Sequence, residues 1–431
     1  MNVIHQLLQD VPIPQMVHIR QNFDATHLED VAYAVKEQLS RPEIESRIAP
    51  GKRIAITCGS RRIANIDLII KTAVQFCQSR GAEPFIFPAM GSHGGSTAQG
   101  QKEICESYGV TEAFCGCPIL SDMNAVSIGM THLGVPAYID PNAAKADGIL
   151  VINRIKAHPG FTGKYESGLM KMMVIGMGKQ IGAATCHQAG FGKFPQYLDV
   201  IGRLILKNAP VIGGLAIIEN AYDQTKEIFA LTPEEIPERE PELLLRAKYS
   251  MPRLLAEHCD VLVIDRMGKD ISGSGMDANI TGRSGSPYKK VENFSAVRVV
   301  ALRLTPESHG SMGGVGNADI INKRIFEDGD ITLTYPNSIT HTYVKADAIP
   351  MMMDSDKLAV QCAIKTCACD DPARLEIIRI QDTLHLRDMY VSKALAEQLT
   401  GRDDIEIVSS PEPWLFDENG NVLDQWENIK F

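Results

Sequence analysis

The chain of 431 residues has no run of about 18 consecutive apolar residues, so no transmembrane helix is expected. Its first residues do not combine a basic stretch with an apolar one, so no signal peptide is expected either. Lys and Arg (43) are outnumbered by Asp and Glu (53), and no basic run could neutralise a phosphate backbone. These absences predict a protein that binds neither membrane nor nucleic acid.

Cysteine is too sparse for a disulfide framework, with ten in the whole chain. Two pairs have the spacing C-x-C, Cys115 with Cys117 and Cys367 with Cys369, but neither has a second pair nearby at zinc-site spacing. We therefore expect reduced, mostly buried thiols and a cytoplasmic location.

Several common catalytic motifs are also missing. Three Gly-Lys pairs (163–164, 178–179 and 192–193) are followed by Tyr, Gln and Phe, whereas a nucleotide-binding phosphate loop requires Ser or Thr there. The segment 273–278 resembles a dinucleotide fingerprint only loosely, because it lies seven residues after its strand. No Gly-x-Ser-x-Gly elbow mounts a hydrolase nucleophile. These patterns exclude the usual nucleotide-binding and serine-hydrolase sites.

The apolar pattern alternates between strand-like and helix-like segments. Residues 53–58 form a β-branched run, 64–80 repeat apolar residues at helical spacing, and 84–88 form another strand. Ser96 with Gln99 has the pattern of a capping box that starts a helix. Strand, helix and strand in this order predict a parallel sheet.

The same alternation continues through the chain. Further strands are predicted at 148–153, 212–218, 260–265, 296–304 and 374–380, and further helices at about 195–208, 241–258, 355–368 and 390–400. A Pro/Glu cluster at 232–241 marks the expected boundary region. We predict two α/β domains with largely parallel sheets, over 1–245 and 246–431, with the active site in the cleft between them.

Three of the histidines lie in glycine-rich segments at the ends of predicted strands or helices: His93, His158 and His187. Loops after the carboxyl ends of parallel strands converge on one crevice, where ligands bind. Imidazole is the usual acid/base near neutral pH and a common metal ligand. The three histidines are therefore candidates for one site. The methionines near 170–177 are expected to pack in the core.

The ordered set of these residues resembles the lactate racemase family, the nickel-pincer-nucleotide enzymes. The resemblance rests on the segments from His158 to Gly163, from Ser167 to Lys171 and from Gly176 to His187, preceded by Gly91-Ser-His93 and by Gly59-Ser-Arg61-Arg62. It covers about residues 50–195 and is weak afterwards.

This resemblance implies an isomerase that racemises or epimerises a 2-hydroxy acid or related polyol acid. It implies that Lys171 attaches the nickel-pincer nucleotide covalently and that His187 binds the nickel, with Lys164 as a competing anchor. His93 and His158 would be the two acid/base histidines, one on each face of the substrate. Hydride would pass to the cofactor and return to the other face of a planar ketone. Enzymes that synthesise the cofactor would be partners.

The chain departs from the family around substrate recognition. Cys58 or Gly59 replaces the family's usual Asp, Gly94 replaces an arginine and Ala278 replaces a Gln. Arg61, Arg62 and Arg283 remain as candidate partners of a substrate carboxylate, because a guanidinium matches a carboxylate in two-pronged fashion. We therefore predict a hydroxy acid larger than lactate.

Two alternatives remain open from the sequence. A metal-dependent hydrolase or lyase could use His93, His158 and His187 as a three-histidine site that activates water. A non-catalytic small-molecule binding protein could keep the same fold without turnover. Lys171 distinguishes the first alternative, since hydrolysis does not require it and attachment of the cofactor does.

Overall fold

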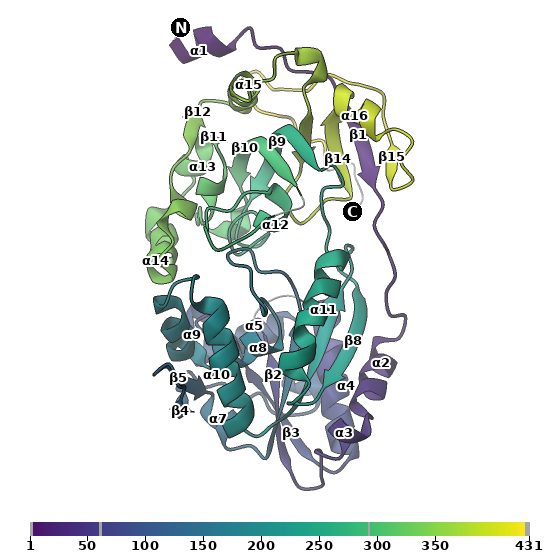
Figure 1. Cartoon of the computed structure of the whole chain (residues 1–431), viewed down its shortest axis with the longest axis vertical. Coiled ribbons are helices and arrows are strands. Elements are labelled where there is room, and N and C mark those ends of the chain that lie inside the picture. Colours follow the sequence, from purple (N-terminus) through teal and green to yellow (C-terminus); the bar gives the residue numbers. More distant parts are fainter. Residues whose placement is uncertain (1–2, 60–62, 292–293, 427–431) are drawn as a thin grey trace. The chain divides into compact units, whose positions relative to one another are not determined.

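The computed structural model describes residues 3–59, 63–291 and 294–426, apart from the side chains of 337, 340 and 341. The chain forms two compact units (Figure 1). Unit 1 combines Met1–Phe23 with Pro252–Phe431, and unit 2 is Asp24–Met251.

This division differs from the predicted domains 1–245 and 246–431 at the N-terminus. Strand β1 (Met16–Gln21) pairs antiparallel with β14 (Asp388–Ser392) and β15 (Ile405–Ile407). The first residues therefore belong to the same sheet as the C-terminal half. Local sequence patterns do not reveal this pairing, because the partner strands lie far away along the chain.

Unit 2 is built on a five-stranded sheet with the order β3-β2-β6-β7-β8. All neighbouring strands are parallel except β7 and β8, which are antiparallel. The strands are β2 (Arg53–Cys58), β3 (Glu83–Pro88), β6 (Gly148–Arg154), β7 (Val211–Glu219) and β8 (Thr225–Leu231). A separate hairpin is made by β4 (Val126–Met130) and β5 (Pro136–Ile139).

Helices cover both faces of this sheet because its strands are apolar on both sides. Alternate residues of β2 separate accordingly: Ile54 and Ile56 enter one core and Ala55 enters the other. The helices of the unit are α2 (Val31–Leu39), α3 (Pro42–Glu45), α4 (Ile66–Ser79), α5 (Ala98–Ser107), α6 (Glu112–Cys115), α7 (Pro141–Ala144), α8 (Leu169–Lys171), α9 (Lys179–Gln188), α10 (Phe194–Asn208) and α11 (Ile236–Ser250), with short turns η1 (Gly94–Ser96) and η2 (Met172–Gly176).

Helix α11 corrects the predicted boundary at the Pro/Glu cluster. It begins within that cluster, ends at Ser250 and lies wholly in unit 2. Pro237 fits the first helical turn, where an N–H has no helical partner. Pro241 cannot donate to the carbonyl of Pro237, and the Tyr165 hydroxyl donates to that carbonyl instead at 2.7 Å. The contact from Tyr165 thus satisfies a carbonyl that the second proline of the helix leaves without its helical donor.

Unit 1 contains an eight-stranded sheet with the order β12-β11-β10-β9-β13-β14-β1-β15. The strands from β12 to β13 are parallel, and β14, β1 and β15 extend the sheet antiparallel. The strands not yet given are β9 (His258–Met267), β10 (Ser295–Leu304), β11 (Ile320–Asn322), β12 (Met351–Met353) and β13 (Ile377–Ile380).

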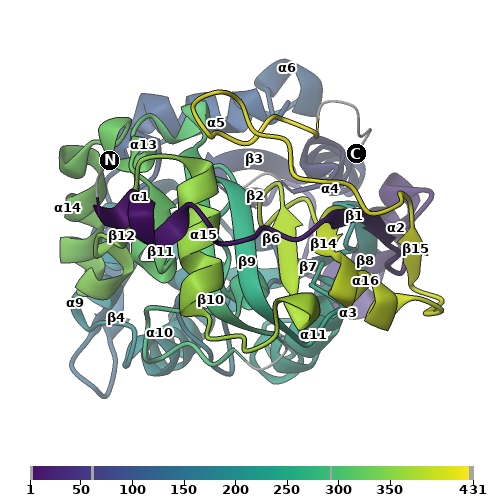
Figure 2. The ribbon, with the colours of Figure 1, turned by 90° about the horizontal axis from the view of Figure 1, so that it is seen from above.

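Helix α15 (Asp356–Thr366) lies across the strands β9, β10 and β11 of unit 1 (Figure 2). The other helices of the unit are α1 (Val3–Leu8), α12 (Ala278–Thr281), α13 (Arg324–Glu327), α14 (Ile331–His341) and α16 (Lys393–Leu399), with turns η3 (Pro306–Ser308), η4 (Val315–Asn317), η5 (Val344–Asp347) and η6 (Pro372–Arg374). The helix predicted at about 390–400 is in fact the end of β14 followed by α16.

The cysteines are free thiols, and all except the half-buried Cys369 are buried. Within the described part of the chain, no helix is long and apolar enough to cross a membrane.

Candidate functional site

Four candidate site residues of unit 2, His93, His158, Lys171 and His187, lie on segments near the carboxyl-terminal end of its parallel strands. His93 follows β3 and His158 follows β6, and both strands run parallel to β2, so their carboxyl ends lie at the same edge. Lys171 ends α8, and His187 lies in α9, the helix that follows the π-helical turn η2. In α/β proteins, ligands usually bind at the carboxyl ends of the parallel strands.

The loop that carries His158 is closed and internally braced. Lys156 and Ser167 pair antiparallel at its base, with N–O distances of 2.9 and 3.1 Å. Inside the loop, the buried carboxylate of Glu166 accepts the main-chain N–H of His158 at 2.7 Å. Lys248 of α11 donates to the same carboxylate at 2.6 Å. This ionic contact fixes the main chain at His158.

The His158 ring has a defined proton arrangement. The main-chain N–H of Gly160 donates to its Nδ1 at 3.0 Å. Because a main-chain N–H can only donate, Nδ1 must be unprotonated in this arrangement, and a neutral ring carries its proton on Nε2. His158 is half-buried, and its ring contacts Phe161 with a centroid distance of 4.3 Å.

An aromatic cluster of Phe161, Phe191 and Phe194 connects His158 with His187. The Phe191 ring lies 5.9 Å from the ring of His158 and 6.2 Å from that of His187. The Phe194 ring lies 5.2 Å from the His187 ring. The two histidines thus border the same apolar cluster, which restricts their ring rotations.

The segment around Lys171 is held from two sides. Asn153, at the end of β6, donates to the Gly168 carbonyl at 2.8 Å. Glu240 of α11 accepts the main-chain N–H of Met170 at 2.9 Å. A Cβ at Gly168 would lie 2.2 Å from the Glu240 carboxylate, so only glycine permits this approach.

Glu240 is almost completely buried, and burial raises its pKa to about 7. Its second oxygen, Oε1, has no hydrogen-bond partner among the described residues. The main-chain N–H groups at Leu169 and Met170 act in the opposite direction, since they stabilise the charged form. Burial outweighs these hydrogen bonds.

The competing anchor Lys164 has a different environment from Lys171. Lys164 is exposed, and its ammonium lies 5.1 Å from the centre of the Tyr165 ring. Lys171 is half-buried and is followed directly by η2, whose turn is closed by a hydrogen bond from Met177 N to the Met172 carbonyl at 2.9 Å. π-Helical turns of this kind are frequent at functional sites.

The His93 loop packs on this same π-helical turn. The N–H of Gly91 donates to the Gly176 carbonyl at 3.1 Å. A Cβ at Gly176 would lie 2.5 Å from the Ala89 carbonyl, so the two segments approach with no side chain between them. His93 is exposed. The start of the His93 loop is therefore fixed against η2, the turn that directly follows Lys171.

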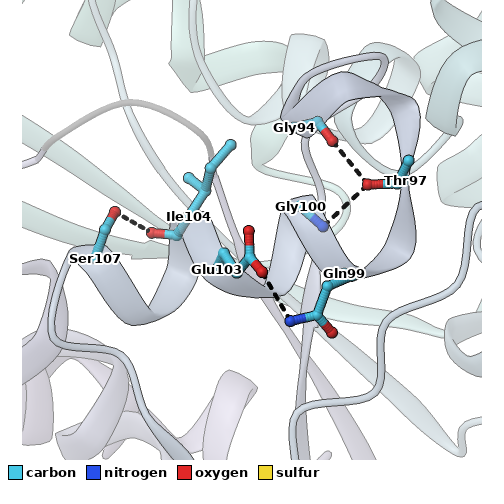
Figure 3. A pocket seen from close by; sticks show the side chains of 7 residues that line it. All are labelled: Gly94, Thr97, Gln99, Gly100, Glu103, Ile104 and Ser107. Atoms are coloured by element: carbon cyan, nitrogen blue, oxygen red, sulfur yellow. Dashed lines mark hydrogen bonds between the residues drawn. The ribbon is translucent and has the colours of Figure 1, made fainter.

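The helix after this loop starts slightly later than predicted. Its N-cap is Thr97, whose hydroxyl accepts the N–H of Gly100 at 3.0 Å, whereas Ser96 adopts a left-handed conformation with φ of 55°. A shallow hollow on the surface at α5 is lined by Gly94, Thr97, Gln99, Gly100, Glu103, Ile104 and Ser107 (Figure 3).

The predicted arginines do not all lie in the described structure. Arg61 and Arg62 fall outside the described residues. Arg283, in unit 1, donates to the Asp319 carboxylate at 2.9 Å and to the carbonyls of Ala296 and Val297 at 2.9 and 2.6 Å. Its guanidinium thus has structural partners, with which a substrate carboxylate would compete.

The three histidines do not converge as a metal site. Within the residues described, which include His93, His158 and His187, no group of three His, Cys, Asp or Glu side chains is placed to hold a metal ion. No preformed three-histidine ligand set of the kind expected for a hydrolase or lyase is thus present among the described residues.

The sequence analysis did not identify three residues that support the site: Glu166, Glu240 and Phe191. An isolated Glu in a glycine-rich loop gives no local signal of its partners, and Glu240 belonged to a cluster interpreted as a boundary. Gly168 is the one sequence feature that indicates such a contact. A glycine directly before a helical turn leaves room for a side chain from another segment.

Comparisons with known proteins provide evidence on the fold. No protein-family model matches the chain, and no curated protein does. Among solved structures, the lactate racemase apoprotein from Thermoanaerobacterium thermosaccharolyticum matches with a TM-score of 0.55 and 14% identity, over 86% of this chain and 98% of that one. A Thermotoga maritima protein matches with a TM-score of 0.49 and 12% identity, over 81% and 87%.

The α/β class with largely parallel sheets is therefore confirmed, since the sheets show it directly and the match covers most of both chains. At 14% identity the likeness is one of fold alone. This chain has a lactate racemase-like fold.

Proposed function

We propose that the protein is a nickel-pincer-dependent racemase or epimerase of a 2-hydroxy acid or related polyol acid. One observation carries the proposal: the segments that bear His93, Lys171 and His187 adjoin η2, and His158 borders the same aromatic cluster as His187. The lactate racemase-like fold supports it.

The residues present suit the cofactor that this function requires. Lys171 offers an amine on a braced, half-buried segment, and His187 offers an imidazole beside an aromatic cluster. In the proposal Lys171 attaches the nucleotide and His187 is the nickel ligand. When bound, the nickel-pincer nucleotide supplies the hydride acceptor of the reaction.

His93 and His158 move the proton of the substrate hydroxyl. The Gly160 N–H bond to Nδ1 leaves the proton of a neutral His158 on Nε2, so His158 starts as a donor toward a substrate oxygen. In this scheme His93, on its exposed loop, starts as the base. Reversal of the two roles would carry the reaction in the other direction.

The size of the substrate is proposed from the positions at which this chain departs from the family it resembles. The positions where the resemblance predicts Asp, Arg and Gln hold Cys58 or Gly59, Gly94 and Ala278. A small hydroxy acid would lose these polar partners, and an unpaired buried polar group costs about 1–3 kcal/mol. We therefore propose a larger hydroxy acid with further hydroxyls or a second carboxylate, held by Arg61 and Arg62.

The test is to produce the protein together with the enzymes that synthesise the cofactor, and to measure intact mass, nickel content and chiral conversion. The proposal predicts an added nucleotide-sized mass, nickel, and racemisation or epimerisation of a hydroxy acid. A protein that carries nickel without the added mass would contradict it. So would a loaded protein that binds hydroxy acids without turnover, which would favour a binding protein.

A further inference from the structure

Lys179 is completely buried, and its ammonium contacts three different segments of unit 2. It forms an ion pair with Asp140, the N-cap of α7, at 3.0 Å. It also donates to the Pro88 carbonyl at the end of β3, at 2.5 Å, and to Gln101 Oε1 on α5, at 3.3 Å. The ammonium thus has two hydrogen-bond acceptors and one counter-ion.

This lysine occupies an unfavourable position for its type. Its φ of 54° lies in the left-handed region that glycine adopts without cost. Burial lowers its pKa, and the Asp140 carboxylate acts in the opposite direction. The proposed chemistry does not use Lys179. Its contacts instead point toward the loop of His93.

Gln101 connects Lys179 with that loop. The buried Gln101 amide donates from Nε2 to the Gly91 carbonyl at 2.9 Å and to the His93 carbonyl at 3.2 Å. A flipped amide would place its NH₂ against the ammonium and its oxygen against two carbonyls. The ammonium of Lys179 therefore determines the orientation in which Gln101 can hold both carbonyls.

The loop also lies directly on the helix that carries Gln101. A Cβ at Gly94 would lie 2.7 Å from Gln101 N, and one at Gly100 would lie 2.2 Å from the Gly94 carbonyl oxygen. The Thr97 hydroxyl connects the same turn, since it donates to the Gly94 carbonyl and accepts from Gly100 N (Figure 3). A small displacement of Gln101 would therefore also shift the main chain of the His93 loop.

We propose that Lys179 is a positioning residue for His93, and that it acts by fixing the Gln101 amide which holds the main chain of the His93 loop. This inference rests on the proposed function for the role of His93. The linkage through Gln101 is a property of the protein itself, so it can be tested without cofactor or substrate.

The central variant is Lys179→Met combined with Asp140→Asn. Lys179→Met alone would leave a buried carboxylate without its counter-ion and destabilise the fold for that reason. The double variant removes both charges, and Asn preserves the N-cap of α7. Lys102→Met is the matched control, because Lys102 directly follows Gln101 on α5 and forms an ion pair with Glu112 at the surface.

The main measurement is hydrogen–deuterium exchange of residues 90–97 in protein without cofactor. We expect exchange about tenfold faster in the double variant. Without Lys179, the orientation of the Gln101 amide is no longer fixed, which weakens its two hydrogen bonds to the Gly91 and His93 carbonyls. In loaded protein we expect unchanged nickel content, kcat lower by about tenfold and KM within about twofold. Lys102→Met should match the wild type in each measurement.

Unchanged exchange in a folded double variant would overturn the inference, and so would a loss that appears in KM alone. If the double variant does not fold, Gln101→Glu replaces it: a carboxylate still accepts from Lys179 and donates to neither carbonyl. Protection at 90–97 in that variant would overturn the inference as well. A wild type that does not racemise would refute the proposed function, whereas the exchange result would still decide the linkage.

Discussion

The carboxylate of Glu240 accepts the main-chain N–H of Met170 at 2.9 Å, at the start of the short helix α8 that ends at Lys171. The two residues are far apart in the chain, and α11 brings the carboxyl group to the start of α8. Burial of this group gives the protein a stability that depends on pH.

Glu240→Gln should remove that dependence. The pKa of Glu240 rises from 4.5 to about 7 on folding, so the unfolded chain ionises first. The free energy of unfolding should therefore fall by roughly 3 kcal/mol as the pH rises from about 4.5 to about 7. The Gln side chain stays neutral, so the variant should lack this fall.

Denaturant unfolding of wild type and variant from pH 4.5 to 8 measures the difference. Glu238→Gln is the control, since Glu238 lies on the same helix with a side chain that is 65% exposed. Parallel pH curves for wild type and Glu240→Gln would rule out the raised pKa.

Lys171→Ala should abolish cofactor attachment. The expected protein is folded and carries neither the added mass nor nickel, because the covalent link requires the amine. The Lys164→Ala variant, which changes an exposed loop residue, should still carry the cofactor and nickel. Intact-mass spectrometry and metal analysis distinguish the two, and the opposite pattern would move the anchor to Lys164.

His93→Ala and His158→Ala should each slow racemisation by roughly 10²–10⁴ while nickel content stays unchanged. Each turnover uses both faces of the substrate, so either loss suffices. Steady-state rates with chiral detection provide the measurement. A loss of nickel in His158→Ala would show that His158 is a metal ligand rather than an acid/base group.

A larger hydroxy acid should be a better substrate than lactate. Loaded enzyme assayed with lactate, malate and longer sugar acids should turn over lactate most slowly, because lactate lacks groups to replace the missing polar partners. Arg61→Ala and Arg62→Ala should raise KM for the preferred acid, since a guanidinium binds a carboxylate in two-pronged fashion. Lactate as the fastest substrate would contradict this prediction.

Arg283→Ala should act mainly on stability. The Asp319 carboxylate and two carbonyls each lose one donor, and we expect unfolding of unit 1 to become easier by about 1–3 kcal/mol. Thermal unfolding provides the measurement, with Lys345→Ala on the same unit as a surface control. A raised KM without a change in stability would instead support contact with substrate.

The sequence alone determined the local elements and the order of the site residues. Strand 53–58 and the helix from about 195 follow from apolar spacing, because the period of a strand or helix is a local property. The placement of His93 and His158 after parallel strands follows from the same pattern, and the structure shows those strands.

Tertiary structure decided which distant groups support these residues. The pairing of β1 with β14, the contact of Glu240 with Met170 and the burial of Lys179 against Asp140 each join segments that no local pattern relates. Sequence periodicity records which side of an element is apolar, but not which partner covers it. Buried polar groups depend on that partner, because their free energy is set by the charge or hydrogen bond they meet.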